Sequence, residues 1–478
     1  METKLIRIAS IDNVAVAVQS LIKGDIVNID EDAFTLLSDI PEGHKVALRN
    51  IAKDEPIIKS GYPIGRAKEE IKKGQIAHIF NIESFSYESL EYSYNEDWAK
   101  ECIKTFELDK TRWTGLIPAI QAYKRQDGRI GIRNSIWILP VDEKASVEAK
   151  NLASWGCANL NTPDGIYAYP ALCDTEESLS LLANLMKHPN AGGVLILASK
   201  YKNETINKLQ AIVSDENLTR VKFSAVSNEA DIASCKAILE ELALELRKDK
   251  RSVQPMNKLS IGIKCDGAES FAAITGNYLV GNFCNELLAM GGTAILVECP
   301  EIFGAEEILI NRAINEDVYK DILKSLKSFK EDIIKSGQAV YTKPSPSEKA
   351  GGISTIEEKA LGCIQKSGKS PVEAVLNYGD FASKNGLSLL FGTEGDVEST
   401  IAETAAGAHI ILFTTGIESQ LESPVPTIKI ASNPNLSSKM IDFNASKMLD
   451  KSPEEVTNEF ISLITSIANG EMHTRNEI

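Results

Sequence analysis

Three groups of polar residues stand where the sequence predicts that buried strands end. They are residues 264–267 (Lys-Cys-Asp-Gly), 298–301 (Glu-Cys-Pro-Glu) and 414–416 (Thr-Thr-Gly). In open α/β sheets, ligands bind beyond the carboxyl ends of the strands, so these groups are candidates to line one crevice. The alternative interpretation is that the strand ends are polar because they reach solvent.

A second candidate is the run of residues 127–134 (Asp-Gly-Arg-Ile-Gly-Ile-Arg-Asn), which places two guanidinium groups and an amide around a turn. Guanidinium groups bind carboxylates through two parallel hydrogen bonds, so this run is suited to clamp a carboxylate. A hairpin with exposed charges would give the same pattern.

Residues 349–359 (Lys-Ala-Gly-Gly-Ile-Ser-Thr-Ile-Glu-Glu-Lys) combine a glycine pair with a predicted helix start. Ser354 or Thr355, with Glu357 or Glu358, forms a plausible capping box. The glycine pair before it would also let backbone amides approach an anion.

Two histidines belong to the first 85 residues. His78 lies at the end of an apolar strand, within residues 76–81, where it is either a packing residue or a ligand. His44 stands in a turn and is interpreted as structural.

The elements that position these residues fall into four segments. Short strands and tight turns predict an all-β domain over residues 1–85, and residues 86–115 read as a linker that lies against the surface. Continuous apolar strands separated by helical patterns predict two α/β domains with mostly parallel sheets, over 116–255 and 256–478. Strands are expected at 192–199, 221–227, 259–265, 293–299, 409–416 and 427–432.

Composition excludes several classes of protein. Of 478 residues, 43% are hydrophobic and 25% are charged, which is typical of a folded soluble chain. The net charge of −16 disfavours nucleic acid or an anionic membrane as the main partner. The eight cysteines form no C-x-x-C pair, which argues against a disulfide framework or a closed zinc site. No signal peptide or membrane-spanning run is visible, so a cytoplasmic protein is expected.

Taken together, these segments resemble the altronate/galactarate dehydratase family over essentially the whole chain. The N-terminal domain resembles the family's SAF (β-clip) domain. The matching runs include residues 43–48, 57–65, 123–134, 137–140, 188–192, 301–306, 344–346, 349–352, 358–363, 412–416 and 426–433.

The resemblance implies β-elimination of water from a hexonate or hexarate, assisted by a divalent metal, iron or manganese. The enediolate formed after removal of the α-proton needs nearby cationic groups or a metal. Implied catalytic residues are Glu301, Glu358, Lys359 and His78; implied substrate-binding residues are Arg133, Asn134, Lys264 and Thr415; implied metal ligands are His78, Cys265 and Asp266. A small sugar acid is the expected partner, and a homo-oligomer is expected on general grounds.

The chain departs from the family pattern at prospective ligand positions. The family's HVHAHN run reads Ile-Ala-His-Ile-Phe-Asn at 76–81, and its GLGCEN turn reads Ala-Ser-Lys-Tyr-Lys-Asn at 198–203. Its TGRGTP run loses an arginine at 415–420. Fewer imidazoles and thiols weaken the binding of soft or borderline divalent ions.

Two hypotheses about function follow from these departures. The chain is a working hydro-lyase with a remodelled site, in which Asp266, Glu269 and His78 serve with Mg²⁺, Mn²⁺ or no metal, or it is a catalytically silent paralogue that binds a sugar acid or a family partner.

Overall fold

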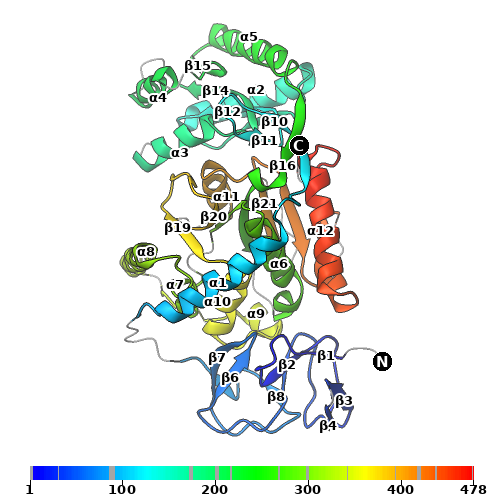
Figure 1. Ribbon diagram of the computed structural model, residues 1–478. Coiled ribbons are helices and arrows are strands. Elements are labelled where there is room, and N and C mark those ends of the chain that lie inside the picture. Colours follow the sequence, from blue (N-terminus) through cyan, green and yellow to red (C-terminus); the bar gives the residue numbers. More distant parts are fainter. Residues whose placement is uncertain are drawn as a thin grey trace.

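Three parts of the chain are stacked along one axis in the computed structural model (Figure 1). The N-terminal strands lie at the bottom, the C-terminal α/β region in the centre, and the middle α/β region at the top. The structure describes residues 4–30, 32–85, 92–171, 176–199, 204–215, 218–266, 270–297, 301–337, 339–341, 343–392, 395–416, 421, 423–436, 439–475 and 477, with the side chains of 176, 177, 215, 265, 266 and 270 outside that description.

Short strands build the N-terminal β region, residues 4–85, as the alternating apolar pattern predicts. Tight turns interrupt every run after a few residues, and three small sheets result, with the orders β1-β2-β5-β8, β3-β4 and β6-β7-β9. The strands are β1 (Leu5–Ile6), β2 (Val14–Ala17), β3 (Ile26–Ile29), β4 (Asp32–Thr35), β5 (Lys45–Ala47), β6 (Pro56–Lys59), β7 (Tyr62–Ala67), β8 (Ile76–Ala77) and β9 (Ile82–Glu83).

The segment expected to be a linker contains a 17-residue helix, α1 (Glu96–Arg112). The side chain of Asn95 caps it by accepting a hydrogen bond from the amide of Trp98, 3.0 Å away. Ala99 and Phe106 are its buried residues. Because so little of the helix is buried, its sequence lacks the regular apolar spacing by which a helix is recognised. It crosses the C-terminal region beside α6 (Figure 1).

The middle α/β region has a four-stranded parallel sheet in the order β13-β12-β14-β15. Its central strands, residues 135–140 and 191–198, are largely apolar runs, because helices cover both faces of the sheet. The elements are β12 (Ser135–Pro140), α2 (Glu143–Asn159), β13 (Ile166–Ala168), α3 (Glu176–Met186), β14 (Ala191–Ala198), α4 (Glu204–Asp215), β15 (Val221–Ala225) and α5 (Glu229–Leu246). A separate antiparallel sheet, β11-β10-β16, connects this region to the next; its strands are β10 (Ala119–Lys124), β11 (Ile130–Gly131) and β16 (Arg251–Pro255).

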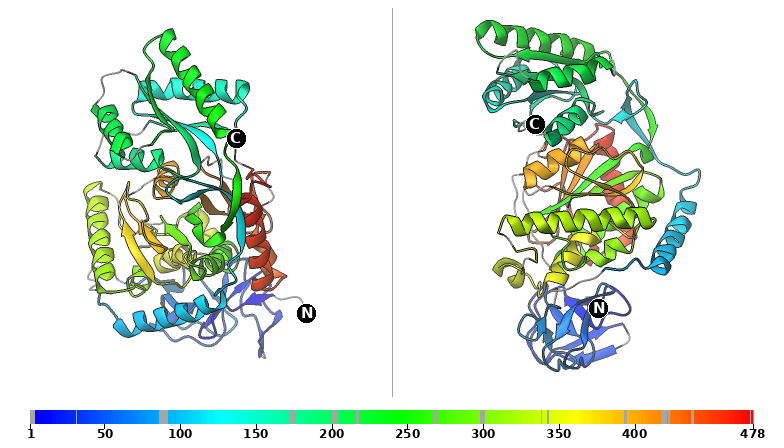
Figure 2. Two further views of the ribbon diagram at one scale, coloured as in Figure 1. Left: turned by 45° about the horizontal axis from the view of Figure 1, so that its top comes forward. Right: turned by 90° about the vertical axis from the view of Figure 1, so that its left-hand side faces the viewer.

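The C-terminal α/β region is built on a seven-stranded sheet in the order β19-β20-β18-β17-β21-β22-β23, with every paired strand parallel. Helices α6 and α12 pack together on one face, and α8 crosses the other (Figure 2, right). The strands are β17 (Ser260–Asp266), β18 (Thr293–Leu296), β19 (Val372–Leu376), β20 (Gly386–Leu390), β21 (Ile410–Thr415), β22 (Thr427–Ala431) and β23 (Phe443–Asn444). The helices are η1 (Met256–Lys258), η2 (Ser270–Ile274), α6 (Gly276–Ala289), α7 (Glu306–Ile310), α8 (Glu316–Lys335), α9 (Pro346–Ala350), α10 (Ile356–Gln365), α11 (Asp396–Ala405), η3 (Ala445–Leu449) and α12 (Pro453–Ala468).

Buried polar side chains join the middle and C-terminal regions. The His409 ring accepts a hydrogen bond from the amide of Ser260 (3.0 Å), and its other ring nitrogen contacts the carbonyl oxygen of Ile130 (2.8 Å). This arrangement fixes one neutral tautomer, in agreement with burial lowering the pKa of His409 to about 4. Among the described helices, none has the length and apolar character needed to cross a membrane.

Candidate active site at the carboxyl edge of the central sheet

A cleft of about 970 Å³ opens between the middle and C-terminal regions. It lies where β19 and β20 end and α11 begins, and its other walls are α8, α3 and the segment after β13. The chain runs from β17 to β18 on one side and later returns to β21 on the other, so β17 marks the point where the strand order reverses. Open α/β sheets bind their ligands at such a point, beyond the carboxyl ends of the strands. The cleft lies at the same end of the sheet, beside β19 and β20, and β20 is two strands away from β17.

Lys264 brings a positive charge to this edge. Lys264 as a whole is 6% exposed, and its Nζ lies 3.4 Å from Oδ1 of Asp396. Asp396 is the first residue of α11 and lines the cleft. Thr415 ends the neighbouring strand β21 and is buried, and its backbone is paired in register with that of Asp266. The expected meeting of these two strand ends is therefore present in the backbone.

Several expected site residues fall partly or wholly outside the described structure. The backbones of Cys265 and Asp266 belong to β17, whereas their side chains are outside the description, as are residues 267–269, 298–300 and 417–420. Glu301 is described and lies partly buried in the turn before α7.

A second group of polar residues lies where the N-terminal β region meets the C-terminal region. We call it the junction cluster: His44, Lys45, Lys59, His78, Ser354 and Glu358. Both lysines point inward from strands and form ion pairs with Glu358, at 2.8 Å for Lys45 and 2.7 Å for Lys59, and all three side chains are nearly inaccessible to solvent. The Ser354 amide donates a third hydrogen bond to Glu358, at 2.8 Å.

Charge and burial fix the protonation of this cluster. Burial raises the pKa of Glu358, but the charges of Lys45 and Lys59 outweigh it and hold the pKa at about 2. Burial, followed by the charge of Lys45, lowers the pKa of His78 to about 4. At neutral pH the cluster therefore holds an ionised carboxylate and a neutral imidazole.

His78 and Lys359 are both engaged with protein groups. Nδ1 of His78 lies 3.1 Å from the Ser354 hydroxyl, and its ring meets that of His44 edge to face with 4.8 Å between centroids. Lys359 forms an ion pair with Glu348, 3.1 Å away, from helix α9. The structure thus brings His78, Glu358 and Ser354 together.

The described surroundings of His78 do not fit a divalent metal. The groups facing its ring are a hydroxyl and a second imidazole, with the Lys45 ammonium close enough to lower its pKa. The nearest carboxylate, Glu358, is already bound by two ammonium groups. Within the described ranges there is no group of three or more His, Cys, Asp or Glu side chains arranged to hold a metal ion.

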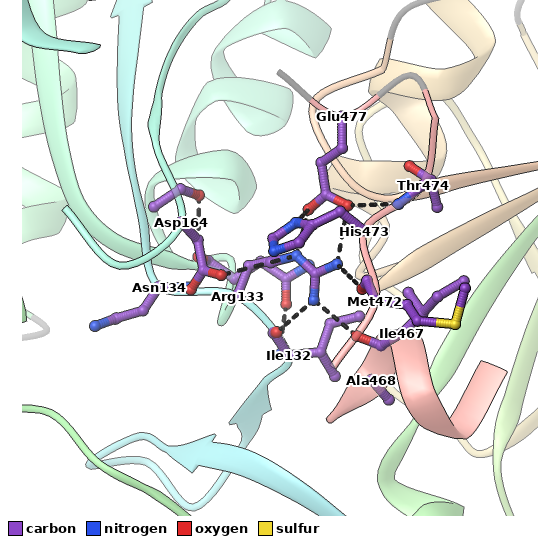
Figure 3. A network of polar contacts seen from close by, with 12 residues as sticks. Ile132, Arg133, Asn134, Asp164, Ile467, Ala468, Met472, His473, Thr474 and Glu477 are labelled. Carbon is purple, nitrogen blue, oxygen red and sulfur yellow. Dashed lines mark hydrogen bonds and ion pairs between the residues drawn. The ribbon is translucent and has the colours of Figure 1, made fainter. Parts of the chain in front are cut away.

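Arg133 and Asn134, expected to bind substrate, lie away from the cleft and hold the chain together. Figure 3 shows the Arg133 guanidinium between Asp164 and Glu477. It donates to Oε2 of Glu477 (2.9 Å) and to the Ile467 carbonyl oxygen at the end of α12 (2.8 Å). The amide oxygen of Asn134 accepts a hydrogen bond from Arg125 (2.9 Å). Neither residue lines the cleft.

Sequence reasoning missed Lys45, Lys59 and Asp396, and it treated His44 as structural alone. A lysine between buried neighbours in a strand is itself a signal, because a charged side chain is almost never fully buried without a partner. Asp396 follows a glycine at a helix start, and a first-turn carboxylate is commonplace there, so its contact with Lys264 had no separate signal.

Family models match the chain in three consecutive pieces. The altronate/galactarate dehydratase SAF domain matches residues 3–85, the D-galactarate dehydratase/altronate hydrolase second domain matches 122–247, and the D-galactarate/altronate dehydratase C-terminal domain matches 256–478. An altronate dehydratase from Bacillus subtilis (strain 168) is 36% identical over 99% of this chain and 97% of the relative. The chain belongs to the altronate/galactarate dehydratase family. This confirms the resemblance and the fold class, an N-terminal SAF domain followed by α/β regions with parallel sheets.

Two further family members differ in their similarity to this chain. An altronate dehydratase from Escherichia coli (strain K12) is 34% identical over 99% of this chain and 96% of the relative. A galactarate dehydratase (L-threo-forming) from the same organism is 26% identical over 93% of this chain and 88% of the relative. Within the family, the altronate dehydratases are thus the more similar of these relatives.

Proposed function

We propose that this protein is a sugar-acid dehydratase that eliminates water from a hexonate of the altronate type and yields a 2-keto-3-deoxy acid. The observation that carries the proposal is the full-length similarity to two altronate dehydratases, at 36% and 34% identity, against 26% for the galactarate dehydratase. Similarity over all three regions does not favour the catalytically silent alternative.

The reaction needs a base, a counter-charge and a proton for the leaving group. A base takes the proton from the carbon next to the carboxylate, and the electron pair becomes an enediolate that cationic groups stabilise. The bond from the β-carbon to its hydroxyl oxygen then breaks, and the hydroxide leaves as water with a proton from a general acid. The enol product tautomerises to the 2-keto-3-deoxy acid.

We assign Lys264 the role of counter-charge, because its ammonium lies at the carboxyl edge of the sheet beside the cleft. Glu301 is the proposed proton-transfer group, since it lies in the turn that follows β18 at this edge. His78 is neutral at pH 7, so its unprotonated form is the one that accepts a proton, and it is the second candidate.

For Glu358, the two ion pairs favour a positioning role over proton transfer. A carboxylate with a pKa of about 2 is a weak base, and this one is enclosed by lysines. Lys359, bound to Glu348, and Thr415, buried at the end of β21, are further candidates for substrate binding.

We propose that this family member uses a divalent metal, iron or manganese. The described residues around His78 do not fit it, so no step of the reaction is routed through it here. We also propose a homo-oligomer, which light scattering of the purified chain would test.

The deciding experiment is a turnover assay with altronate, galactarate and their epimers, under anaerobic conditions with iron or manganese added, that follows 2-keto-3-deoxy acid formation. We expect turnover of altronate, and we expect Lys264→Met to lower kcat by about 10²- to 10³-fold, the cost of removing one stabilising group from a developing anion. Lys222→Met is the matched control, because Lys222 also lies on a parallel strand and pairs with a helix carboxylate, Glu241, at 2.9 Å. No product from folded protein, while a known altronate dehydratase turns over alongside, would overturn the proposal.

A further inference from the structure

A second cavity, of about 520 Å³, lies at the opposite edge of the middle sheet from the cleft. It is lined by the β10–β11 turn, by residues 186–189 before β14, and by residues 218–221 at the start of β15. Strand β14 begins at this cavity with Ala191 and ends at Ala198. Eight extended residues span about 23 Å, so the cavity is separate from the carboxyl edge of the sheet. We call it the basic pocket.

The basic pocket concentrates positive charge on a strongly acidic chain. Its lining contains five cationic side chains and two carboxylates, whereas the whole chain carries a net charge of −16. The five are Lys124, Arg125, Arg129, Lys187 and Arg220. A concave surface of one sign raises the local concentration of ions of the opposite sign.

The two carboxylates of the lining are already matched by two of the arginines. Asp249 accepts hydrogen bonds from Arg220 at 2.5 and 2.9 Å. Asp127 accepts one from Arg129 at 2.7 Å. With five cationic side chains and two carboxylates, the lining carries a formal excess of three positive charges.

Arg125 is held in place by neutral groups. Its guanidinium donates to the Pro189 carbonyl oxygen (2.7 Å), the Asn134 side-chain oxygen (2.9 Å) and the Arg133 carbonyl oxygen (3.0 Å). Asp249, already bound by Arg220, is 3.6 Å away. Burial lowers the pKa of Arg125 to about 10, which reflects the cost of placing this cation out of water.

Gly131 is needed for this arrangement. A Cβ atom at residue 131 would lie 2.0 Å from the Pro189 carbonyl oxygen and 3.0 Å from Nη2 of Arg125. A glycine therefore allows the β10–β11 hairpin to approach residues 187–189 closely, and the approach fixes the guanidinium at the pocket wall. Of the two arginines in the run 127–134 that was expected to clamp a carboxylate, Arg129 therefore lines this pocket and Arg133 does not, and Arg125 just before the run is a further arginine of the lining.

We propose that the basic pocket is a second binding site, distinct from the cleft, for a small organic or inorganic dianion such as a phosphate group or a dicarboxylate. Arginine recognises both groups through paired hydrogen bonds, and an excess of positive charge in the lining favours a dianion over a monoanion.

The test is calorimetry of the full-length protein with three probes that carry no sugar hydroxyl groups: inorganic phosphate, succinate as a dicarboxylate and acetate as a monoanion. We expect phosphate or succinate to bind saturably with Kd of about 1 mM or tighter, and acetate at least about tenfold more weakly. Saturation by phosphate alone, by succinate alone or by both identifies the anion class within the proposal. Saturation by neither up to about 20 mM overturns it.

Variants place the binding in the pocket. Lys124 is exposed at the rim, so Lys124→Glu should fold normally, keep its turnover and weaken the anion's binding about tenfold, or about 1.4 kcal/mol. Lys150→Glu is the matched control, because it makes the same charge change at an exposed position on α2. Lys264→Met changes a residue beside the cleft and none in the basic pocket, so it should leave the binding of the anion unchanged. Equal weakening in the Lys124 and Lys150 variants, or loss of binding in the Lys264 variant, would refute the assignment.

Discussion

Removing the charge of Glu477 should detach the C-terminal tail from the middle region. Glu477 bonds Arg133 through both carboxylate oxygens and also accepts a hydrogen bond from the Thr474 amide at 3.1 Å. The side chains of the ion pair are 3% and 7% exposed. Glu477→Gln keeps the shape of the side chain, but it leaves a buried guanidinium whose nearest remaining carboxylate is Asp164, 3.9 Å away.

Breaking a buried pair by removing one partner costs about 3 to 5 kcal/mol, and the amide oxygen and Asp164 keep some compensation, so we expect about 3 kcal/mol. For a region of this size, about 3 kcal/mol corresponds to a fall in Tm of about 6 to 12 °C. The assay is differential scanning calorimetry, with the first transition compared because a chain of several domains does not unfold in one step.

The control is Glu471→Gln, an exposed residue of the same tail whose side chain accepts a hydrogen bond from Asn469 at 3.0 Å. Its Tm should stay within about 1 °C of the parent protein, as for most surface substitutions. If Glu477→Gln also melts within that range, the Arg133 ion pair does not hold the tail and the reasoning fails. Rescue by Arg133→Met in the Glu477→Gln background would support it, because the unpaired buried charge is then removed.

Three further predictions concern buried contacts. Glu358→Gln leaves Lys45 and Lys59 as buried cations, so we expect faster hydrogen exchange over residues 45–64, with stability lower by about 3 to 5 kcal/mol. Glu358 has a folded-state pKa of about 2, below its ordinary value, so its ionised form stabilises the folded protein fully above about pH 4.5. This contribution to the free energy of unfolding is lost as the pH falls towards 2. Acid titration monitored by fluorescence should show the loss in the parent protein and not in Glu358→Gln. Gly131→Ala forces a Cβ to within 2.0 Å of a carbonyl oxygen and should lower Tm by several degrees. Gly362→Ala in helix α10 is the control, because its Cβ would lie 3.4 Å from the nearest atom, and its Tm should not fall.

Each of these has an outcome that would contradict it. Unchanged exchange over residues 45–64 in Glu358→Gln would mean that the junction does not depend on the ion pairs. An equal acid transition in parent and variant would assign the titration to another group. Equal melting of the two alanine variants would mean that the hairpin can retreat from residues 187–189 without cost.

The layered parts of the fold were predictable, because buried parallel strands are continuous apolar runs. The run predicted at 427–432 forms β22 (Thr427–Ala431), and the run predicted at 221–227 contains β15 (Val221–Ala225). Helix α1 was not predictable in the same way. It buries a small face against α6, and its polar surface outweighs that signal.

The candidate site was predictable only where local sequence fixes geometry. Lys264 follows directly from the end of a strand, and its place at the sheet edge is a property of that strand alone. Arg133 shows the limit: its carboxylate partner is 344 residues away in the chain, and no local pattern announces such a contact. A guanidinium in a glycine turn looks the same whether it binds a substrate or the chain's own C-terminal tail.

The junction cluster has a consequence for biosynthesis. Lys45 lies 313 residues before its partner Glu358, and ribosomes add about 5 to 20 residues per second, so the lysine waits about 15 to 60 s for its carboxylate. An apolar docking surface exposed for that time would favour association with other chains. A lysine stays hydrated until Glu358 has been synthesised, and it loses its hydration only when the ion pair forms. A contact made of charged side chains therefore lowers the risk that the nascent chain aggregates before its C-terminal region is complete.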